Sequence, residues 1–320
     1  MASSGSYNFS VQRDNIINAA LQHVGMIGEG ETGTSSQISE AALLLNMIVK
    51  LREADGMPLW ALKRGYILPF SGSSSISTSS HVVHSYDTTT LSANSPTSDT
   101  TLTVTSISGF SNGDQIGIEL DNGDIDWTTV SGAPSGTTIT ITTGVTSAAS
   151  TGNRVFGYTA STDRVQKPLR ILQADILDVT GGTSHEIISN LAMSDYYRLG
   201  ARTSEGTPNQ LFYDLVPGSD TAVDTDGTIY IYPRFANGDY VIEFTYHRPF
   251  QDFDSATDTP DFPQAFYLPL MLELAALLGI KGGVTIEERR SLLTEAKMYR
   301  DEALATISPE NSYFFEPRYN

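Results

Sequence analysis

The sequence contains no cysteine, so disulfide bonds and metal sites built from thiolates are both excluded. Long apolar runs are also missing, because no stretch approaches the ~20 apolar residues that a helix needs to cross a bilayer. The opening residues MASSGSYNFS lack the charged-then-apolar pattern of a secretory signal. We therefore expect a protein with no membrane partner, which stays in the cytoplasm or becomes part of a particle.

Basic residues are scarce: 19 lysines and arginines stand against 37 acidic residues, for a net charge of −18. A protein that binds nucleic acid by neutralising phosphates needs lysine and arginine gathered on one face. An acidic excess usually serves solubility, but a ring with an acidic lumen would repel a DNA duplex and let it slide through. The composition leaves both interpretations open. With 320 residues, the chain can build a full core and two domains.

Recognisable catalytic patterns are missing too. The sequence has no nucleophile elbow, no catalytic triad spacing and no phosphate-binding loop. Carboxylates that could cleave a sugar chain are plentiful, but no pattern singles out the pair that such a reaction needs. We therefore predict no catalytic residue, no cofactor and no enzymatic activity.

Two polar clusters were weighed as metal sites. His81 and His84 are three residues apart, which places them on opposite sides of a strand. The run Asp121-Asn-Gly-Asp124-Ile-Asp126 lacks the spacing of an EF-hand loop, whereas its Asn-Gly pair is typical of a hairpin turn. The sequence therefore predicts a turn at residues 121–124 and no metal site.

The stretch from Ala19 to Trp60 predicts two helices joined by a glycine-rich turn. Ser36 or Ser39 is the expected cap of the second helix, and Gly56 its expected end. Three polar residues of this helix, Asn46, Lys50 and Glu53, are expected to turn away from its apolar stripe. The stripe is formed at three-to-four spacing by Ile38, Ala41, Ala42, Leu45, Ile48, Val49 and Arg52.

Composition changes after Phe70. Between residues 71 and 160 serine, threonine and glycine dominate, and Arg154 is the single basic residue. Short alternating strands are expected near residues 102–107, 116–120, 127–130 and 138–141, with turn residues between them. Short, evenly spaced strands predict a small all-β insertion, either a sandwich or a barrel.

Mixed character returns in residues 161–307. A hairpin is expected where two strands flank Ala236-Asn-Gly-Asp239, followed by a helix over residues 264–280. Thr285 and Glu288 form a capping box for a last helix. The predicted fold class is therefore α+β: a discontinuous helical-bundle domain from residues 1–70 and 161–307, which includes a β-hairpin region and is interrupted by the β-rich insertion at 71–160. Residues 308–320 form an extended tail.

These elements resemble the head-to-tail adaptor family of short-tailed bacteriophages. In the N-terminal half the resemblance rests on an A-L-x-x-V-G start, a Gly/Thr/Ser loop, Leu44-Leu45-Asn46-Met47 and a D-G-x-x-L-W ending. In the C-terminal half it rests on Gly206-Thr-Pro208, Leu211-Phe-Tyr213, Ile229 to Pro233 and a Leu/Ala-rich segment from Leu268 to Leu278. It covers Asn15 to Phe70 and Pro168 to Ala305, and leaves out the β-rich insertion.

The resemblance implies a structural virion protein, or head-tail connector, assembled in the host cytoplasm and located in the tail or neck of the particle. It implies a homo-oligomeric ring, dodecameric in the family, attached under the portal protein ring. Such a ring closes the DNA-filled head and provides the platform for the tail nozzle and for a fibre or spike. Duplex DNA would pass through its lumen without specific binding.

The C-terminal tail is the expected portal-binding segment. Tyr313, Phe314, Phe315, Arg318 and Tyr319 follow Pro309 with no helical period, and exposed aromatic clusters are usually contact surfaces. The position of this tail matches the segment that docks into the portal in the adaptor family. Two alternatives stay open. The tail could fold back onto its own domain, or the protein could be a tail component whose β-module binds a receptor or carbohydrate.

Overall fold

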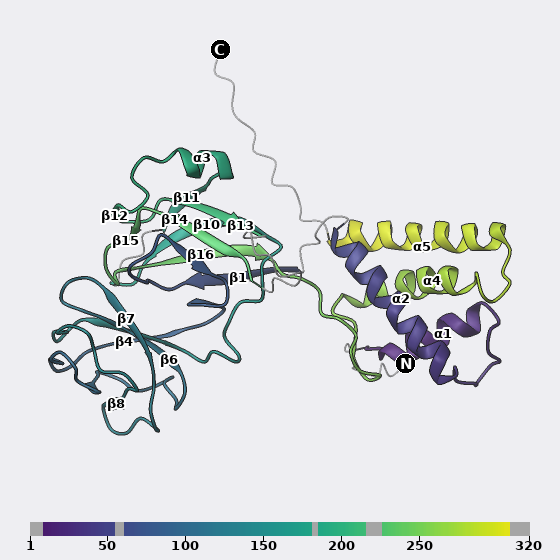
Figure 1. Ribbon diagram of the computed structural model, residues 1–320. Coiled ribbons are helices and arrows are strands. Elements are labelled where there is room, and N and C mark those ends of the chain that lie inside the picture. Colours follow the sequence, from purple (N-terminus) through teal and green to yellow (C-terminus); the bar gives the residue numbers. More distant parts are fainter. Residues whose placement is uncertain (1–8, 55–60, 181–184, 216–225, 308–320) are drawn as a thin grey trace, which may run out of the picture. The chain divides into compact units, whose positions relative to one another are not determined.

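A computed structural model describes residues 9–54, 61–180, 185–215 and 226–307. The chain has a mixed α+β fold, which confirms the predicted class at that level. Its contacts divide it into two compact units (Figure 1). The helical unit comprises residues 1–61 and 250–320, and the β unit comprises residues 62–249.

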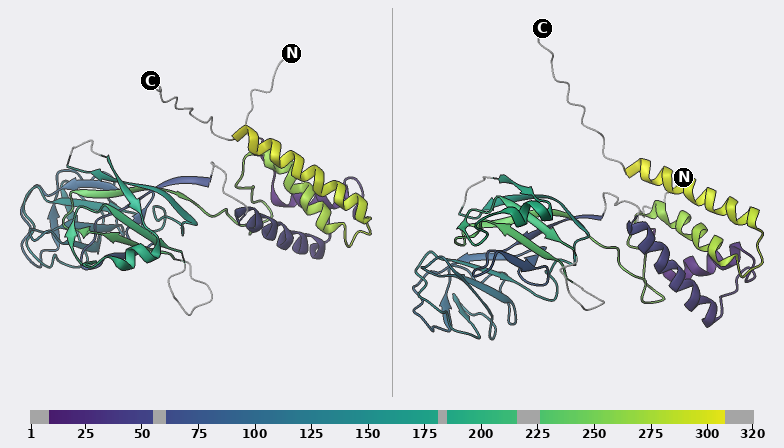
Figure 2. Two further views of the ribbon diagram at one scale, coloured as in Figure 1. Left: turned by 90° about the horizontal axis from the view of Figure 1, so that it is seen from above. Right: turned by 45° about the horizontal axis from the view of Figure 1, so that its top comes forward.

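The helical unit is organised around α4, which packs against α1, α2 and α5. Figure 2 shows α4 between α5 on one side and α2 on the other. Eight of the twelve residues of α4 are buried, as expected for a helix surrounded by others. The helical elements are α1 (Arg13–His23), α2 (Ser35–Ala54), the 3-10 turn η2 (Gln264–Phe266), α4 (Tyr267–Leu278) and α5 (Ile286–Ile307).

One apolar core joins α1, α2 and α4. The inward face of α2 carries Ala41, Leu45, Ile48 and Val49, which confirms that part of the predicted stripe. Ala61 and Phe250, the residues next to the two boundaries with the β unit, are also buried in this core. The two boundary residues of the helical unit are therefore packed in its core.

The caps of two helices follow the capping-box pattern. In α5 the Thr285 N–H donates to Glu288 Oε2 at 3.1 Å and the Glu288 N–H donates to Thr285 Oγ1 at 3.3 Å, as predicted. In α2 the pair is Thr34 and Gln37, joined by bonds of 2.8 and 3.3 Å. The predicted caps of α2, Ser36 and Ser39, instead lie inside the helix, because the box begins one residue before Ser35.

The β unit is built on an eight-stranded sheet. Its neighbouring strands are antiparallel, apart from the parallel pair β11–β13. Helix α3 (Met193–Arg198) covers part of one face, where Tyr196 lies 5.9 Å from Phe212 between ring centroids. In spatial order the strands are β2 (Ser75–Ser77), β14 (Thr228–Tyr232), β13 (Gln210–Asp214), β11 (His185–Asn190), β10 (Arg170–Asp178), β16 (Tyr240–His247), β1 (Leu62–Ile67) and β3 (Val82–Val83).

A smaller all-β module lies within the β unit, from residue 87 to residue 158; the predicted insertion began at residue 71, but β2 and β3 belong to the large sheet. Its two sheets share one apolar core. A second cluster joins it to the large sheet, where Leu68, Val83 and Val241 meet Phe156 and Tyr158. The module consists of β4 (Asp87–Thr90), β9 (Arg154–Tyr158), β6 (Gln115–Glu119) and β7 (Ile125–Thr129) in one sheet, and of β5 (Thr101–Thr103) and β8 (Thr138–Thr140) in the other.

The predicted hairpin around residues 236–239 is wrong. Strand β14 pairs with β13 and β2, whereas β16 pairs with β1 and β10, so the two flanking strands do not meet. Between them, β15 (Arg234–Phe235) pairs with β12 (Glu205–Gly206) and leads the chain away. The Asn-Gly pair contacts the small module instead, since the Gly238 N–H donates to Glu119 Oε1 at 3.1 Å.

The boundaries between the units also differ from the predicted ones. Residues 161–249 were grouped with the C-terminal helices, but they lie in the β unit. The reason is strand pairing: β16 binds β1 over the whole register from Leu62–His247 to Ile67–Ile242. Long-range pairing of this kind depends on tertiary contacts, which a change of composition along the chain does not reveal.

Candidate interaction surface on the helical unit

The outer face of α2 carries an exposed apolar row, which we call the α2 stripe. It consists of Leu43, Met47 and Leu51, whose side chains are 58, 56 and 57% exposed. Residues four apart lie on the same side of a helix, so these three form one line. The core-facing residues occupy the opposite side of α2. A contiguous apolar row on a surface usually marks a contact with another molecule.

A second exposed row lies along α5, and we call it the α5 stripe. It consists of Ile286, Leu293 and Leu304, with Ile286 60% exposed. Small buried residues, Ala296 and Ala303, lie about a quarter turn from this row and form the face on α4. Because α5 packs on α4 with this narrow face, much of its circumference is open. The helical unit therefore presents apolar rows on two different helices.

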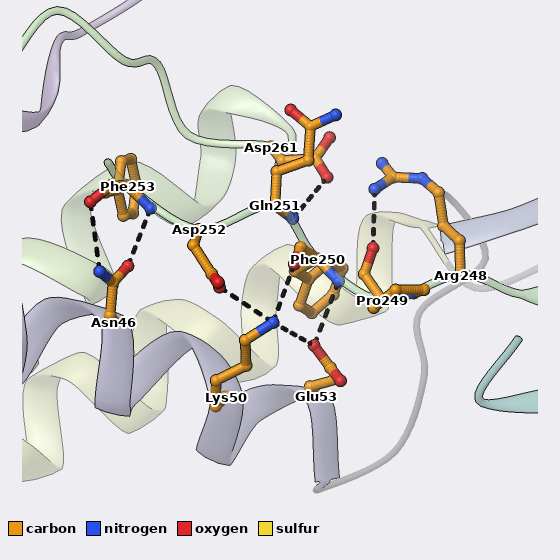
Figure 3. Close-up of polar contacts among 10 residues, drawn as sticks. All are labelled: Asn46, Lys50, Glu53, Arg248, Pro249, Phe250, Gln251, Asp252, Phe253 and Asp261. Atoms are coloured by element: carbon orange, nitrogen blue, oxygen red, sulfur yellow. Dashed lines mark hydrogen bonds and ion pairs between the residues drawn. The ribbon is translucent and has the colours of Figure 1, made fainter. Parts of the chain in front are cut away.

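Behind the α2 stripe, the polar residues of α2 bind the backbone of the segment that enters the helical unit. We call this segment, residues 250–253, the strap (Figure 3). Asn46 pairs with the peptide groups of Phe253: its Nδ2 donates to the Phe253 oxygen at 3.2 Å, and its Oδ1 accepts the Phe253 N–H at 2.9 Å. Glu53 Oε2 accepts the N–H of Phe250 at 3.1 Å. Side chains of α2 thus complete the hydrogen bonds of a segment without regular structure.

Lys50 provides the third contact with the strap. Its ammonium group lies 3.0 Å from Asp252 Oδ1, 3.0 Å from the oxygen of Phe250 and 3.3 Å from Glu53 Oε2 (Figure 3). Burial would lower the pKa of Lys50, but the hydrogen bond to Asp252 and the charges of Glu53 and Asp252 outweigh it, so the pKa is raised. Lys50 therefore stays charged and fixes the strap next to α2.

An ion cluster connects three helices. Glu273 of α4 is buried, and its carboxylate accepts hydrogen bonds from Arg52 of α2 at 2.7 and 3.1 Å. Arg300 of α5 lies 3.4 Å from Glu273 Oε1, the oxygen that Arg52 contacts at 2.7 Å. A buried carboxylate is tolerated when charged donors satisfy it, and its loss leaves those donors without a counter-charge. Glu273 therefore sets how α2 and α5 lie against α4.

The predicted portal-binding residues lie outside the described residues. Tyr313, Phe314, Phe315, Arg318 and Tyr319 all belong to residues 308–320, so their assignment stays a prediction. The sequence missed the roles of Asn46, Lys50 and Glu53, which were expected simply to face away from the core. Their exposed helical positions gave no indication of the strap, since the partner lies about 200 residues further along the chain.

The two histidines weighed as a metal site have different partners. His81 stacks on Trp127 with ring centroids 3.9 Å apart, whereas His84 Nδ1 lies 3.4 Å from the hydroxyl of Tyr246. Burial, with a smaller effect of Arg164, lowers the pKa of His81 to about 4. Within the described ranges no group of three or more His, Cys, Asp or Glu residues is arranged to hold a metal ion.

The second polar cluster forms the predicted hairpin turn. Strands β6 and β7 pair on either side of it, and Gly123 adopts a positive φ of 89° that favours glycine. The carboxylates are bound to neighbouring loops: Asp121 Oδ1 accepts the Ser150 N–H at 2.8 Å, and Asp126 Oδ2 accepts the Thr146 N–H at 2.6 Å. These oxygens therefore stabilise the small module.

Comparison with known proteins gave no relative: no model of a protein family matches the chain, and no curated protein matches it. In the part of the chain that the structure describes, none of the helices combines the length and the apolar character that crossing a membrane requires.

Proposed function

We propose that this protein is a head-to-tail adaptor of a short-tailed bacteriophage, a structural virion protein that acts by assembly and not by catalysis. The observation that carries the proposal is the α2 stripe, an apolar surface on a unit that already has a complete core. The adaptor resemblance of residues 15–70 includes this helix, with Leu44-Leu45-Asn46-Met47 at its centre. A protein made to join a ring needs such a surface, whereas a monomeric enzyme does not.

In this proposal the helical unit is a discontinuous helical bundle that forms a ring under the portal.

 The contacts of the strap and of the Glu273 cluster hold the second chain connection and three helices in one arrangement, as a ring component requires. The portal protein would bind on one side, and the nozzle and a fibre or spike on the other. Duplex DNA would pass through an acidic lumen without specific binding.

The test uses purified portal rings and the full chain. Truncation after Ile307 removes the predicted portal-binding tail, and we expect it to abolish attachment to the rings in a co-sedimentation assay. The melting temperature should stay within about 1 °C of the full-length value, because no described core residue lies beyond Ala303. If attachment survives and the melting temperature falls by several degrees, the tail belongs to the core and the assignment is wrong.

A receptor- or carbohydrate-binding tail protein is the second candidate, and one feature of the β unit favours it. Tyr197 is exposed, and the guanidinium of Arg202 lies 5.2 Å from the centre of its ring. An exposed aromatic ring beside polar groups is a common element of ligand sites. Light scattering after size exclusion separates the candidates: an adaptor should be monomeric without the portal, whereas a receptor-binding tail protein is expected to be a stable trimer.

A further inference from the structure

We infer that the α2 stripe of one copy docks against the α5 stripe of a second copy. This inference rests on the proposed ring and names the contact that would build it. The occupant of the α2 stripe is thus neither the portal nor the nozzle, but the same chain. The argument depends on where the two stripes lie, on their apolar spacing and on their charges.

The two stripes belong to different helices of the same unit. Helix α4 lies between α2 and α5 (Figure 2). The stripes are therefore two separate patches. A contact between two different patches is heterologous: each copy uses one patch for the preceding neighbour and the other for the following one. When the rotation between copies closes, such a contact produces a ring.

The apolar spacing of the stripes fits packing between helices. Leu43 and Leu51 are eight residues apart and Ile286 and Leu293 seven, which correspond to about 12 and 10 Å along a helix. Side chains at three-, four- and seven-residue spacing form the ridges that enter the grooves of a facing helix. The α2 stripe can therefore interlock with the part of the α5 stripe between Ile286 and Leu293 over about two turns.

The charges favour a contact between α2 of one copy and α5 of another over a contact between two α2 helices or two α5 helices. Arg290 and Lys297 alternate with the apolar residues of the α5 stripe, and the described part of the chain offers neither side chain a hydrogen bond or ion pair. Contact between two α5 stripes would bring these unpaired positive charges together. The α2 stripe is bordered by the carboxylates of Glu40 and Asp252. A facing acidic border would supply the missing partners and fix the register.

The α2 border keeps a negative excess after its internal pairs are counted. Glu40 is paired with Lys281, and Lys50 is shared between Asp252 and Glu53. Three carboxylates therefore surround the stripe with two ammonium groups, which leaves one negative charge. On the α5 side Asp301 is 3.8 Å from Arg300, and Glu287 is a further carboxylate beside the stripe, so Arg290 and Lys297 leave one positive charge. The two surfaces are thus opposite in sign as well as apolar.

The absence of native cysteine makes a cross-linking test direct. The full chain would carry Met47→Cys and Leu293→Cys together, in the presence of portal rings, and a short bismaleimide would trap the contact without the strict geometry of a disulfide. We expect cross-linked dimers and longer oligomers. The matched control is the double variant Met47→Cys with Glu295→Cys. Residue 295 lies about 200° round α5 from Leu293, so this variant should stay mostly monomeric.

Mixing single variants decides between the types of contact. A mixture of Met47→Cys with Leu293→Cys should give a dimer and no longer species, because each copy then has one reactive patch. Either variant alone should stay monomeric. A dimer of Met47→Cys alone would show α2 against α2 and overturn the inference, and so would equal cross-linking of the control.

The outcomes for this contact and for the adaptor proposal are read separately. Portal attachment is measured by co-sedimentation, and the contact by the cross-linked products. If copies attach to portal rings and the double variant yields no cross-linked oligomer, the contact is wrong and the adaptor proposal stands. If the oligomers form at high protein concentration and portal rings bind none of them, the contact stands and the adaptor proposal fails.

Discussion

The helical unit and the β unit differ in how completely each covers its apolar surface. Among the described residues fifteen large apolar side chains are exposed, and ten of them belong to the helical unit, although it is the shorter of the two. The β unit places its small module over one region of the large sheet, where Phe156 and Tyr158 meet Leu68 and Val83. Among the described residues of the helical unit, no comparable module covers the outer face of α2. The contrast is what the proposed association through the α2 stripe would lead us to expect.

The two units also bury charge differently. In the helical unit the buried Glu273 is held by two guanidinium groups, from Arg52 and Arg300. In the β unit the buried Asp114 accepts neutral donors, the Ser111 N–H at 2.6 Å and the Thr159 hydroxyl at 2.7 Å. Removing the carboxylate charge strands two cations in the first case and none in the second. Substitutions should therefore affect the two units unequally.

The largest effect is expected from Glu273→Gln. The neutral amide keeps the shape but leaves Arg52 and Arg300 without a counter-charge, at a cost of about 3 kcal/mol after allowance for their partial exposure. The matched change Asp114→Asn in the β unit should cost about 1 kcal/mol, since its donors are neutral. Thermal melting followed by circular dichroism at the helical band measures the loss of stability in Glu273→Gln.

Fluorescence of Trp127, in a Trp60→Phe background, measures the loss of stability in Asp114→Asn, because Trp127 lies in the β unit. An equal loss for the two substitutions, or a larger one for Asp114→Asn, would contradict the contrast between an ionic and a neutral site.

The next effect is a loss of stability of the β unit in acid. His81 has a folded pKa of about 4 because of burial, below the 6.5 of the free side chain. Above pH 6.5 both states are neutral and the shift has no effect. As the pH falls from 6.5 to about 4, the unfolded state takes up the proton first, so stability decreases by about 2–3 kcal/mol. The pKa values of His84 and His247 are lowered in the same direction.

The matched variant is His81→Asn, because the backbone at residue 81 has a φ of 42° and asparagine tolerates this region. Urea unfolding followed by Trp127 fluorescence between pH 7 and 4 should show a smaller loss in His81→Asn than in the wild type. The same loss in both would mean that His81 does not cause the acid sensitivity.

A smaller effect is expected when the strap is released. Asn46→Ala removes both hydrogen bonds to the peptide groups of Phe253, which costs about 1–2 kcal/mol in a partly buried site. Ser39→Ala on the same helix is the control and should change the free energy of unfolding by less than about 0.5 kcal/mol. Hydrogen exchange of the Phe253 amide should accelerate in Asn46→Ala alone. Unchanged exchange would show that the strap is held by other contacts.

Local patterns in the sequence predicted local structure well. The alternation in residues 115–130 with Asn122-Gly123 gave the β6–β7 hairpin, and Thr285 with Glu288 gave the start of α5. Each of these features depends on residues close together in the chain, whose geometry the side chains themselves determine. The α+β class, though not the finer description of the domains, followed from the same local patterns.

Features that depend on distant partners could not be predicted. Asn237-Gly238 has the same pattern as Asn122-Gly123, yet it binds Glu119 while β14 and β16 enter different parts of the sheet. Asn46 and Lys50 have the spacing of a solvent-facing side of a helix, but they bind the backbone of the strap. The α2 stripe was likewise invisible, because the sequence shows how apolar a helix is and not which of its faces stays uncovered.

The smallest effect on stability is expected from the α2 stripe itself, and it tests the comparison most directly. Leu43→Gln with Met47→Gln changes two side chains that are 58 and 56% exposed, so each loses little buried area on substitution. The free energy of unfolding should stay within about 0.5 kcal/mol of the wild type. Leu45→Gln is the matched control: it lies on the same helix with a fully buried side chain and should cost about 3 kcal/mol or more. Binding of a dye that reports exposed apolar surface should fall in the double variant. It should not fall in variants that change surface residues of the β unit. A loss above 2 kcal/mol in the double variant would mean that the helical unit covers this row itself, and the contrast between the two units would then disappear.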